Sequence, residues 1–412
     1  MDKNKRLTVW LPVIIAASIA LGIFIGNHYL SISQGKKRSY SSGNKINAIL
    51  DIIDEQYVDT VSMSKLVEST IPKIFSELDP HSVYIPAEDA SVVNEELEGS
   101  FSGIGVSFNM QTDTILVISV ISGGPAEKAG LLPFDRIISI NDSIFSGKKK
   151  NQGEIMKTIR GAKNSTVKLG VQRGNSPELL YFDVTRGDVP VNSVDVSYEA
   201  AKGIGYIKVS KFARNTYNEF ITAIAKLKQA GCTSFVIDLR GNTGGYMDAA
   251  INMINEFMPE GRLIVYTEGK SFPRSDVYAN GTGTCKDAPI VVLTDEISAS
   301  ASEIFSGAIQ DNDRGTIIGR RTYGKGLVQT QMSLSDGSEM RLTIARYYTP
   351  SGRCIQKKYE MGNTDAYDQD IYNRYMHGEF DSADSIKMDD SLKYQTVGGR
   401  TVYGGGGIMP DI

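Results

Sequence analysis

The chain has 412 residues, of which 41% are hydrophobic and 22% are charged, a usage that excludes collagen-like, mucin-like and wholly disordered chains. Its formal net charge is -4, so no global basic field exists to hold phosphates, and we expect no nucleic acid partner. The chain contains 3 histidines, so a histidine-based catalytic or metal site would have to draw on His28, His81 and His377.

The amino terminus carries a membrane-targeting pattern. Basic residues ending at Arg6 precede an apolar run over residues 7–26, which matches the ~20 residues that cross a bilayer as a helix. A small-x-small cleavage pattern ends at Ala20, but cleavage there would leave a new apolar start. We therefore predict an uncleaved signal anchor over residues 1–30. Basic residues lie on both sides of the run, so the charge pattern leaves its orientation open.

Residues 31–97 are predicted to form a tether and a small helical region. A Ser-, Gly- and Lys-rich stretch over 31–43 is typical of a flexible linker. From residue 45 to 78, apolar residues recur at the spacing of one helical face. The three cysteines of the chain lack CxxC spacing, so the sequence predicts neither a zinc site nor a disulfide framework.

Residues 98–187 are predicted to form a compact β-rich domain with one helix over 152–159. Short runs rich in Val and Ile alternate with turns that contain Gly and Asn, and such runs predict strands. The predicted strands are 104–108, 115–121, 136–140, 166–172 and 179–185. Three motif pieces make this region resemble a PDZ domain: Gly103-Ile104-Gly105-Val106, Gly124-Pro125-Ala126 and Asp135-Arg136-Ile137.

In PDZ domains, a Gly-bounded loop directs backbone N–H groups toward a peptide carboxylate, and the following strand pairs with the peptide. The resemblance implies that the loop, the first strand and the helix bind a peptide. The implied peptide-binding residues are Gly103, Ile104, Gly105, Val106, Ile155 and Ile159. The alternative is that the apolar residues belong to the domain core and that the glycines only serve turns.

Residues 188–412 are predicted to form an α/β core. Strands at 204–209, 234–239, 263–266, 289–294 and 316–319 alternate with helical patterns that begin near residues 216, 247 and 300. Repeated β-α units imply a largely parallel sheet covered by helices. Catalytic residues are expected on the loops at the strand ends. A polar segment near 363–393 is interpreted as a surface insertion without an assigned role.

Two glycine-rich loops of this core invite different interpretations. Residues 238–245 close a strand and open a helix, where free N–H groups suit an oxyanion, although such a turn is often plain geometry. Residues 319–325 match the first seven positions of a P-loop. However, Gly326 stands where a Ser or Thr should bind magnesium, and a strand-like run follows. We therefore reject a nucleotide site.

Ser300 stands at the predicted start of a helix. Ser300-x-x-Glu303 is a capping box, which needs no catalysis to explain it. The same position also suits a nucleophile, because the N–H groups of the first helical turn stabilise nearby negative charge. Lys325 is a candidate base, since a desolvated lysine has a lowered pKa. Gln329 is placed to orient its amine, so a Ser-Lys pair would need no histidine.

From about residue 46 onward, the chain resembles the carboxyl-terminal processing peptidases, or tail-specific proteases, a Ser-Lys family with an embedded PDZ domain. Six motif pieces in family order carry the resemblance: Leu78-Asp79-Pro80-His81-Ser82, Gly103-Ile104-Gly105, Asp238-Leu239-Arg240-Gly241-Asn242 with Gly244-Gly245, Ser298-Ala299-Ser300-Ala301-Ser302-Glu303, Tyr323-Gly324-Lys325-Gly326, and Gly404-Gly405-Gly406-Gly407-Ile408 with Pro410-Asp411.

The resemblance implies a role for each residue of the site. Ser300 is the nucleophile, Lys325 the general base and Gln329 the group that orients the lysine. Backbone N–H groups at Ala301 and at Gly244 or Gly245 form the oxyanion hole, and the sequence does not choose between the glycines.

The expected fold is therefore multidomain α/β, with a membrane anchor, a small helical unit, a PDZ domain and a protease core of the ClpP/crotonase-like type. The expected function is that of a membrane-tethered serine endopeptidase that recognises the C-termini of protein or peptide substrates. Because family members work outside the cytoplasm, we expect the body on the periplasmic or extracytoplasmic side. We expect no cofactor and no metal, and a homo-oligomer is left open. The alternatives are a catalytically silent periplasmic PDZ scaffold and a crotonase-like acyl-thioester enzyme.

Overall fold

A computed structural model describes residues 16–23, 42–111, 114–144, 152–386 and 388–412. The chain divides into two compact units, residues 1–70 and residues 71–412. Of the predicted membrane segment 7–26, only residues 16–23 are described, and they form a helix. No helix in the described part of the chain is long and apolar enough to cross a membrane. The predicted anchor thus lies largely outside the described residues and stays a prediction.

The predicted helical region contains two helices, α2 Ser42–Gln56 and α3 Met63–Ser76. A short strand, β1 Val83–Ile85, and a third helix, α4 Ala87–Glu98, follow in the second unit. The periodic apolar spacing of residues 45–78 therefore identified helices correctly.

The PDZ region forms a six-stranded sheet in the order β3-β4-β5-β7-β8, with β6 beside β5. Its elements are β3 Val106–Gln111, β4 Thr114–Val120, α5 Pro125–Ala129, β5 Arg136–Ile140, β6 Ser143–Ile144, α6 Gln152–Ile159, β7 Thr166–Gln172 and β8 Leu180–Thr185. Two outer strands, β2 Ser100–Gly103 and β9 Gly187–Pro190, pair antiparallel where the chain enters and leaves the domain. The predicted strand 104–108 is divided, because Ile104 and Gly105 form a break between β2 and β3.

The parallel sheet of the core has the order β10-β11-β12-β15-β16. Its strands are β10 Val194–Ala201, β11 Ile204–Val209, β12 Ser234–Asp238, β15 Ile290–Thr294 and β16 Thr316–Gly319. The last four strands run parallel, and β10 is antiparallel to β11. Four of the five predicted strands run parallel in this sheet, so a largely parallel sheet is confirmed. The fifth, predicted at 263–266, belongs instead to the antiparallel sheet described next, so the prediction was wrong for that strand.

A second, antiparallel sheet has the order β1-β18-β13-β14, with β17 also paired to β18. Its strands in the core are β13 Leu263–Glu268, β14 Ser275–Tyr278, β17 Leu327–Ser333 and β18 Glu339–Tyr348. The sequence analysis did not assign β18, although Met340, Leu342 and Ile344 alternate with Arg341 and Thr343 in the period-two pattern that favours a strand. The strand β17 follows Lys325 where a P-loop would require a helix.

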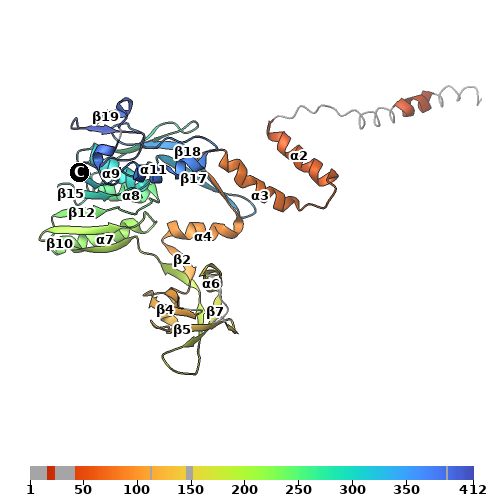
Figure 1. Cartoon of the computed structure of the whole chain (residues 1–412), viewed down its shortest axis with the longest axis horizontal. Coiled ribbons are helices and arrows are strands. Elements are labelled where there is room, and N and C mark those ends of the chain that lie inside the picture. Colours follow the sequence, from red (N-terminus) through yellow and green to blue (C-terminus); the bar gives the residue numbers. More distant parts are fainter. Residues whose placement is uncertain (1–15, 24–41, 112–113, 145–151, 387) are drawn as a thin grey trace, which may run out of the picture. The chain divides into compact units, whose positions relative to one another are not determined.

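Three long helices pack in the core: α7 Thr216–Gln229 against β10 and β11, α8 Met247–Asn255 against α7 and α9, and α9 Ala301–Asp311 between the two sheets. Figure 1 shows α8 and α9 with β12 and β15 on one side and β18 on the other. Every residue of α9 is buried, and α9 contacts both β16 and β13. Because α9 is enclosed on all sides, the loop that precedes it is held firmly in place.

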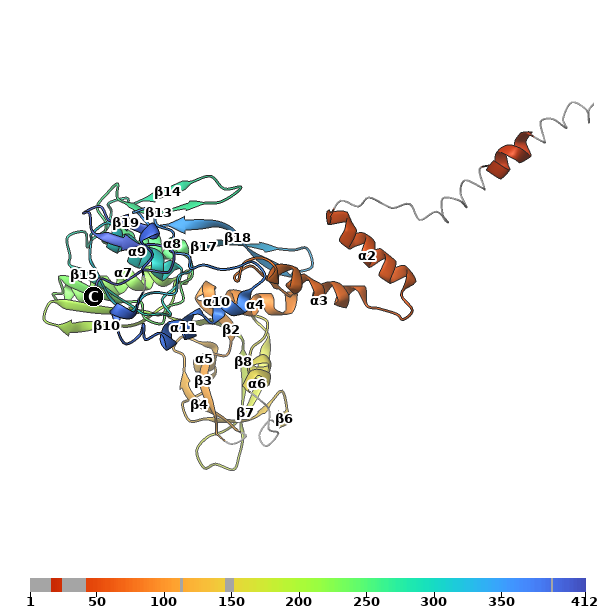
Figure 2. The ribbon, with the colours of Figure 1, turned by 45° about the horizontal axis from the view of Figure 1, so that its top comes forward.

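The carboxyl-terminal part continues the core. It contains α10 Thr364–Asp368, α11 Asp370–Met376, two 3-10 turns at Ala383–Ser385 and Asp390–Leu392, and the strands β19 Lys393–Gln395 and β20 Thr401–Tyr403. Figure 2 shows α10 and α11 in blue. Tyr367 is 3% exposed and Arg374 is 5% exposed. The sequence suggested that the polar segment near 363–393 is a surface insertion. The segment does not lie wholly on the surface, because these two side chains are buried.

Candidate active site

Ser300 occupies the turn between β15 and α9 in a strained backbone conformation. Its φ is 56° and its ψ is -112°, a region that non-glycine residues seldom adopt and that is frequent at functional sites. The neighbouring serines are held elsewhere: the Ser298 hydroxyl donates to the Leu239 carbonyl at 2.8 Å, and the Ser302 hydroxyl donates to the Asn242 carbonyl at 2.9 Å. Of these three serines, Ser300 is the one whose side chain lines the cavity described below.

Glu303, in the first turn of α9, is fully buried and accepts hydrogen bonds from two loops. Its carboxylate accepts from the N–H of Ser300 at 2.8 Å, from the N–H groups of Gly324 and Lys325 at 2.7 and 2.9 Å, and from the Thr322 hydroxyl at 2.6 Å. Burial raises the pKa of Glu303 to about 7, although these donors act in the opposite direction. One carboxylate thus joins the loop of the predicted nucleophile to the loop of the predicted base.

Tyr347 of β18 joins the same two loops through their carbonyl groups. Its buried hydroxyl lies 3.1 Å from the Ser300 carbonyl oxygen and also contacts the carbonyl oxygen of Lys325. Glu303 therefore fixes the backbone N–H groups of Ser300 and Lys325, and Tyr347 lies against their carbonyls.

Lys325 is half-buried in the loop between β16 and β17. Its amine donates to Oε1 of Gln329 at 3.1 Å, as the sequence predicted for an orienting residue. Burial lowers the pKa of Lys325, and the positive charge of Arg341 lowers it further, whereas Asp79 and Glu303 raise it. The net effect increases the neutral fraction of the amine, which a general base requires.

Gly244 and Gly245 lie in the turn that follows β12, with φ values of 103° and 140°; Gly244 packs against Ser300, and Gly245 packs against the backbone of Phe212. A Cβ on Gly244 would lie 2.8 Å from the Ser300 Cβ, so this approach requires glycine. The Gly244 N–H already donates to Oδ1 of Asn242 at 2.9 Å. In the described part of the chain, no backbone hydrogen bond outside the regular elements uses the N–H of Gly245 or of Ala301. These two N–H groups are therefore the ones available to an oxyanion.

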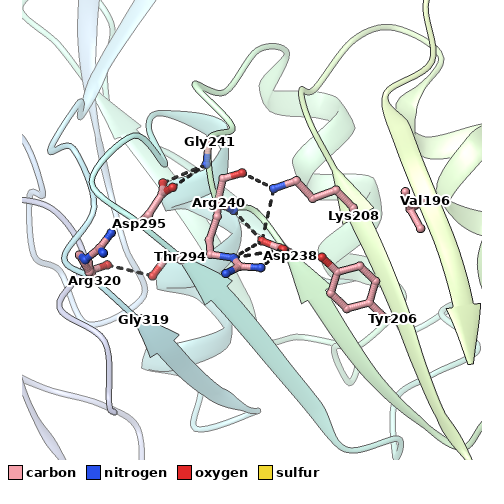
Figure 3. A pocket seen from close by; sticks show the side chains of 10 residues that line it. All are labelled: Val196, Tyr206, Lys208, Asp238, Arg240, Gly241, Thr294, Asp295, Gly319 and Arg320. Atoms are coloured by element: carbon pink, nitrogen blue, oxygen red, sulfur yellow. Dashed lines mark hydrogen bonds and ion pairs between the residues drawn. The ribbon is translucent and has the colours of Figure 1, made fainter. Parts of the chain in front are cut away.

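The first half of the same turn is anchored by Asp238, which is 1% exposed at the end of β12. Figure 3 shows this carboxylate among the side chains of Tyr206, Lys208 and Arg240. Burial alone would raise the pKa of Asp238, but hydrogen bonds from Arg240 and Tyr206 lower this pKa to about 2. On the far side of the turn, the Asn242 amide donates to the Val209 carbonyl at 3.0 Å. The glycine pair is thus carried on a turn fixed at both ends.

Ser300, Lys325, Gln329, Gly244 and Gly245 line one cavity of about 890 Å³. Its apolar wall contains Met247, Ile304, Leu327, Val328 and Tyr347, and its polar wall contains Asn94, Glu98, Asp248, Gln331 and Arg341. The volume is in the range of sites that bury a small ligand or a short stretch of chain. Within the described residues, no group of three or more His, Cys, Asp or Glu side chains is placed to hold a metal ion.

The PDZ residues fall into two groups. Ile104, Ile155 and Ile159 are at most 4% exposed and belong to the domain core, so they pack against one another rather than lining an open groove, which corrects the prediction for these side chains. Val106 begins β3, which is the end strand of its sheet and has no second partner among the described strands. The free edge of β3 is therefore available for an added strand.

The chain matches two known families. Residues 203–365 match peptidase family S41, and residues 102–195 match the PDZ domain. The chain is 33% identical to a probable CtpA-like serine protease of Staphylococcus aureus over 365 residues, which are 87% of this chain and 72% of that protein. This chain belongs to peptidase family S41. The resemblance to the carboxyl-terminal processing peptidases that the sequence motifs indicated is thereby confirmed.

Two further proteins similar to this chain are described as carboxyl-terminal processing proteases. The chain is 35% identical over 318 residues to the carboxy-terminal processing protease CtpB of Bacillus subtilis. The aligned region covers 76% of this chain and 66% of CtpB, slightly less than two thirds of the length of CtpB. Among solved structures, the photosystem II D1 C-terminal processing protease aligns with a TM-score of 0.42 and 27% identity, over 76% of this chain and 90% of that chain.

Sequence reasoning missed two contributors to this S41 site. Glu303 was explained as part of a capping box, and the structure has that capping box, in which the Glu303 side chain accepts from the Ser300 N–H. No local sequence pattern predicts the hydrogen bonds that Glu303 accepts from Gly324 and Lys325, because these partners lie 21 and 22 residues away. Tyr347 was missed together with the strand that carries it.

Replacing Glu303 by Gln should impair both folding and catalysis. Gln offers a single acceptor oxygen to four donors and turns its own NH2 group toward them. We expect the free energy of unfolding to fall by about 2–4 kcal/mol, since each unsatisfied buried donor costs about 1–3 kcal/mol. We expect kcat/KM for an unstructured protein substrate to fall by roughly 100-fold or more through misplacement of the two loops.

Urea unfolding and steady-state kinetics measure both effects. Glu296→Gln is the matched control, because Glu296 pairs with a half-exposed arginine on the surface and should cost less than about 1 kcal/mol. A Glu303→Gln variant with unchanged kcat/KM would contradict the role assigned to this carboxylate.

The pH dependence of hydrolysis should report the state of Lys325. A lysine acts as a general base in its neutral form, so with Lys325 as the predicted base kcat/KM should rise with pH and level off above a midpoint that lies below the ordinary lysine pKa of 10.5. Arg341→Gln removes a positive neighbour that lowers this pKa, so the midpoint should move to higher pH. Arg346→Gln, on the same strand, should leave the midpoint in place. A midpoint that moves to lower pH in Arg341→Gln would show that another group limits the rate.

Proposed function

We propose that this S41 chain is a serine endopeptidase in which Ser300 is the nucleophile and Lys325 the general base. The observation that carries the proposal is the arrangement around one cavity: a strained serine and a half-buried lysine of lowered pKa, with both backbones fixed by the same buried Glu303. Strain and a perturbed pKa at convergent side chains are typical of catalytic sites.

In the proposed reaction, the Ser300 Oγ attacks the carbonyl carbon of the scissile peptide bond while its proton passes to the neutral amine of Lys325. The oxyanion of the tetrahedral intermediate accepts hydrogen bonds from the N–H groups of Gly245 and Ala301. The C–N bond then breaks, and the Lys325 ammonium gives the proton to the leaving amine. Water, deprotonated by the same amine, hydrolyses the acyl-enzyme and restores Ser300. Gln329 holds the amine in place throughout.

The PDZ domain is proposed to capture the carboxyl terminus of the substrate. The free edge of β3 offers main-chain hydrogen bonds to an extended peptide. Gly105 has a φ of 79°. In the described part of the chain, the N–H groups of Ile104 and Gly105 donate no backbone hydrogen bond outside those between paired strands. Such a loop suits a carboxylate.

The location of the enzyme is proposed from the sequence. The apolar run at 7–26 would tether the chain to a membrane, with the catalytic body on its extracytoplasmic side. Neither the scaffold nor the acyl-thioester alternative is favoured by an observation at the site. A silent scaffold would not need a strained serine opposite a lysine, and an acyl-thioester enzyme would not need the PDZ edge.

Single substitutions test the proposed dyad. Ser300→Ala and Lys325→Ala should each lower kcat for an unstructured protein substrate by roughly 1000-fold or more, because members of a catalytic unit act together. Ser143→Ala and Lys202→Ala, both at exposed positions, should keep the wild-type rate. Full activity in either dyad variant would refute the assignment.

Removal of the PDZ domain tests substrate recruitment. The strands β2 and β9 pair through Gly103 and Gly187, so residues 104–186 can be replaced by a short Gly-Ser linker that joins these partners. Intact protein should cleave a substrate with a free apolar carboxyl terminus roughly tenfold faster than its amidated counterpart, because a charged hydrogen-bond acceptor is lost on amidation. The shortened protein should cleave both at one rate; a variant that still discriminates would contradict PDZ capture.

A further inference from the structure

The side-chain amide of Gln329 is fixed at both ends. Its Oε1 accepts from the Lys325 amine at 3.1 Å, and its Nε2 donates to the backbone carbonyl of His81. A carbonyl oxygen accepts hydrogen bonds and cannot donate them. The His81 carbonyl therefore selects the amide orientation in which an acceptor, rather than an NH2 group, faces the lysine.

The turn that presents the His81 carbonyl is itself immobilised. The Asp79 carboxylate accepts from the N–H groups of His81 and Ser82, both at 3.0 Å, and from the hydroxyls of Ser82 and Thr343 at 2.5 and 2.9 Å. Burial alone would raise the pKa of Asp79, but these hydrogen bonds leave that pKa below its ordinary value. The turn is thus bound to β18 through Thr343.

The ring of His81 is held from the opposite direction by α10. Its Nε2 lies 2.9 Å from the hydroxyl of Tyr367, and the two rings meet edge to face at 5.2 Å. Burial, and then the positive charge of Lys325, lower the pKa of His81 to about 4. At neutral pH this imidazole is uncharged and serves as a rigid link.

Tyr367 also reaches the other side of the base. The Gln356 amide donates to its hydroxyl at 3.3 Å and accepts, through Oε1, from the N–H of Gly326 at 2.8 Å. The amine of Lys357 lies 4.0 Å from the ring centroid of Tyr367 and 4.0 Å from that of Tyr323, a cation–π contact that holds the ring. The Tyr367 hydroxyl is therefore linked through His81 to Gln329 and through Gln356 to the backbone of Gly326, which follows Lys325.

We propose that Tyr367 is a positioning residue for the catalytic base, acting through His81 and Gln329, and that α10 is thereby a part of the active site. The inference rests on the proposed Ser300–Lys325 chemistry. Tyr367 and His81 both lie outside residues 102–195 and 203–365, which match the PDZ and S41 families. Neither residue lines the catalytic cavity, so their effect reaches the reaction through Gln329.

The charges that face Lys325 make a distinctive signature possible. They come from Arg341 on β18, Asp79 in the 78–82 turn and Glu303 on α9. The neutral ring of His81 also lies within the electrostatic reach of Lys325 and Lys357. None of these charges changes when the Tyr367 hydroxyl is removed. A released Gln329 would deprive the lysine ammonium of an acceptor, which lowers the lysine pKa, and would leave the neutral amine poorly oriented.

The test measures the rate at which a fluorophosphonate probe labels Ser300 in the full chain as a function of pH. In Tyr367→Phe, we expect the plateau rate to fall roughly tenfold and its midpoint to move to lower pH. The KM for a peptide substrate should stay within about twofold of wild type. In a Gln329→Ala background, Tyr367→Phe should change the rate by at most about twofold, because the effect passes through that residue.

Two further comparisons keep the test decisive. Tyr372→Phe, at a position 62% exposed on the adjacent helix, is the matched control and should label as wild type. His81→Gln can place an amide nitrogen where the ring Nε2 stands and should keep most of the rate, whereas His81→Leu should reproduce Tyr367→Phe. This pair also serves if Tyr367→Phe does not fold.

The outcomes separate the two claims. If wild-type protein is not labelled, the proposed function fails. If wild-type protein is labelled and Tyr367→Phe has the same rate and midpoint, the positioning role alone is overturned. A lower rate with an unmoved midpoint and an equal loss in the Gln329→Ala background would assign Tyr367 a purely structural role, which also overturns the proposal.

Discussion

The active site of this S41 protein depends on one buried carboxylate. Glu303 has no exposed surface, and an ionised carboxylate in such a place is costly unless donors surround it. Its four donors come from the strained serine turn and from the Thr322–Lys325 loop. The two loops therefore cannot separate without stripping the carboxylate of its partners, and this couples the position of Ser300 to that of Lys325.

The surrounding fold supplies the rigidity that this arrangement needs. Helix α9 is buried along its whole length between two sheets, so Glu303 stands on an element that cannot tilt. Strand β18 brings Tyr347 against the carbonyls of the same two loops. The Asp238 cluster holds the glycine turn opposite Ser300. Each support comes from a different segment of the chain, which explains why the site has no compact sequence signature.

The sequence was informative wherever a property is local. Strand β16 and helix α6 follow from the spacing of their apolar residues and from the turn residues that bound them, and their predicted bounds agree with the structure. Ser300 and Lys325 could be proposed from the sequence because a helix start and a Gly-Lys-Gly turn have recognisable chemistry, and both line the same cavity. Local reasoning could not choose between Gly244 and Gly245, and the proposal of Gly245 rests on the Asn242 side chain, which accepts from the Gly244 N–H in the structure. Nor could it find Tyr367, whose partner His81 lies 286 residues away.

The scarcity of histidine has a physical counterpart in the site. His28 lies outside the described residues, and His377 caps the end of α11. His81 reaches the site, but burial and the charge of Lys325 hold its pKa near 4, and its contact with Gln329 is made by the backbone. The proposed proton acceptor is therefore Lys325, whose own pKa is also lowered by burial.

The most direct test of a lysine-activated serine is to locate the adduct that a fluorophosphonate probe forms on the intact protein, by mass spectrometry of the digested chain. The account predicts one adduct on Ser300, absent from Lys325→Ala and present in Lys202→Ala. An adduct on Ser298 or Ser302, or equal labelling of Lys325→Ala and wild type, would contradict it.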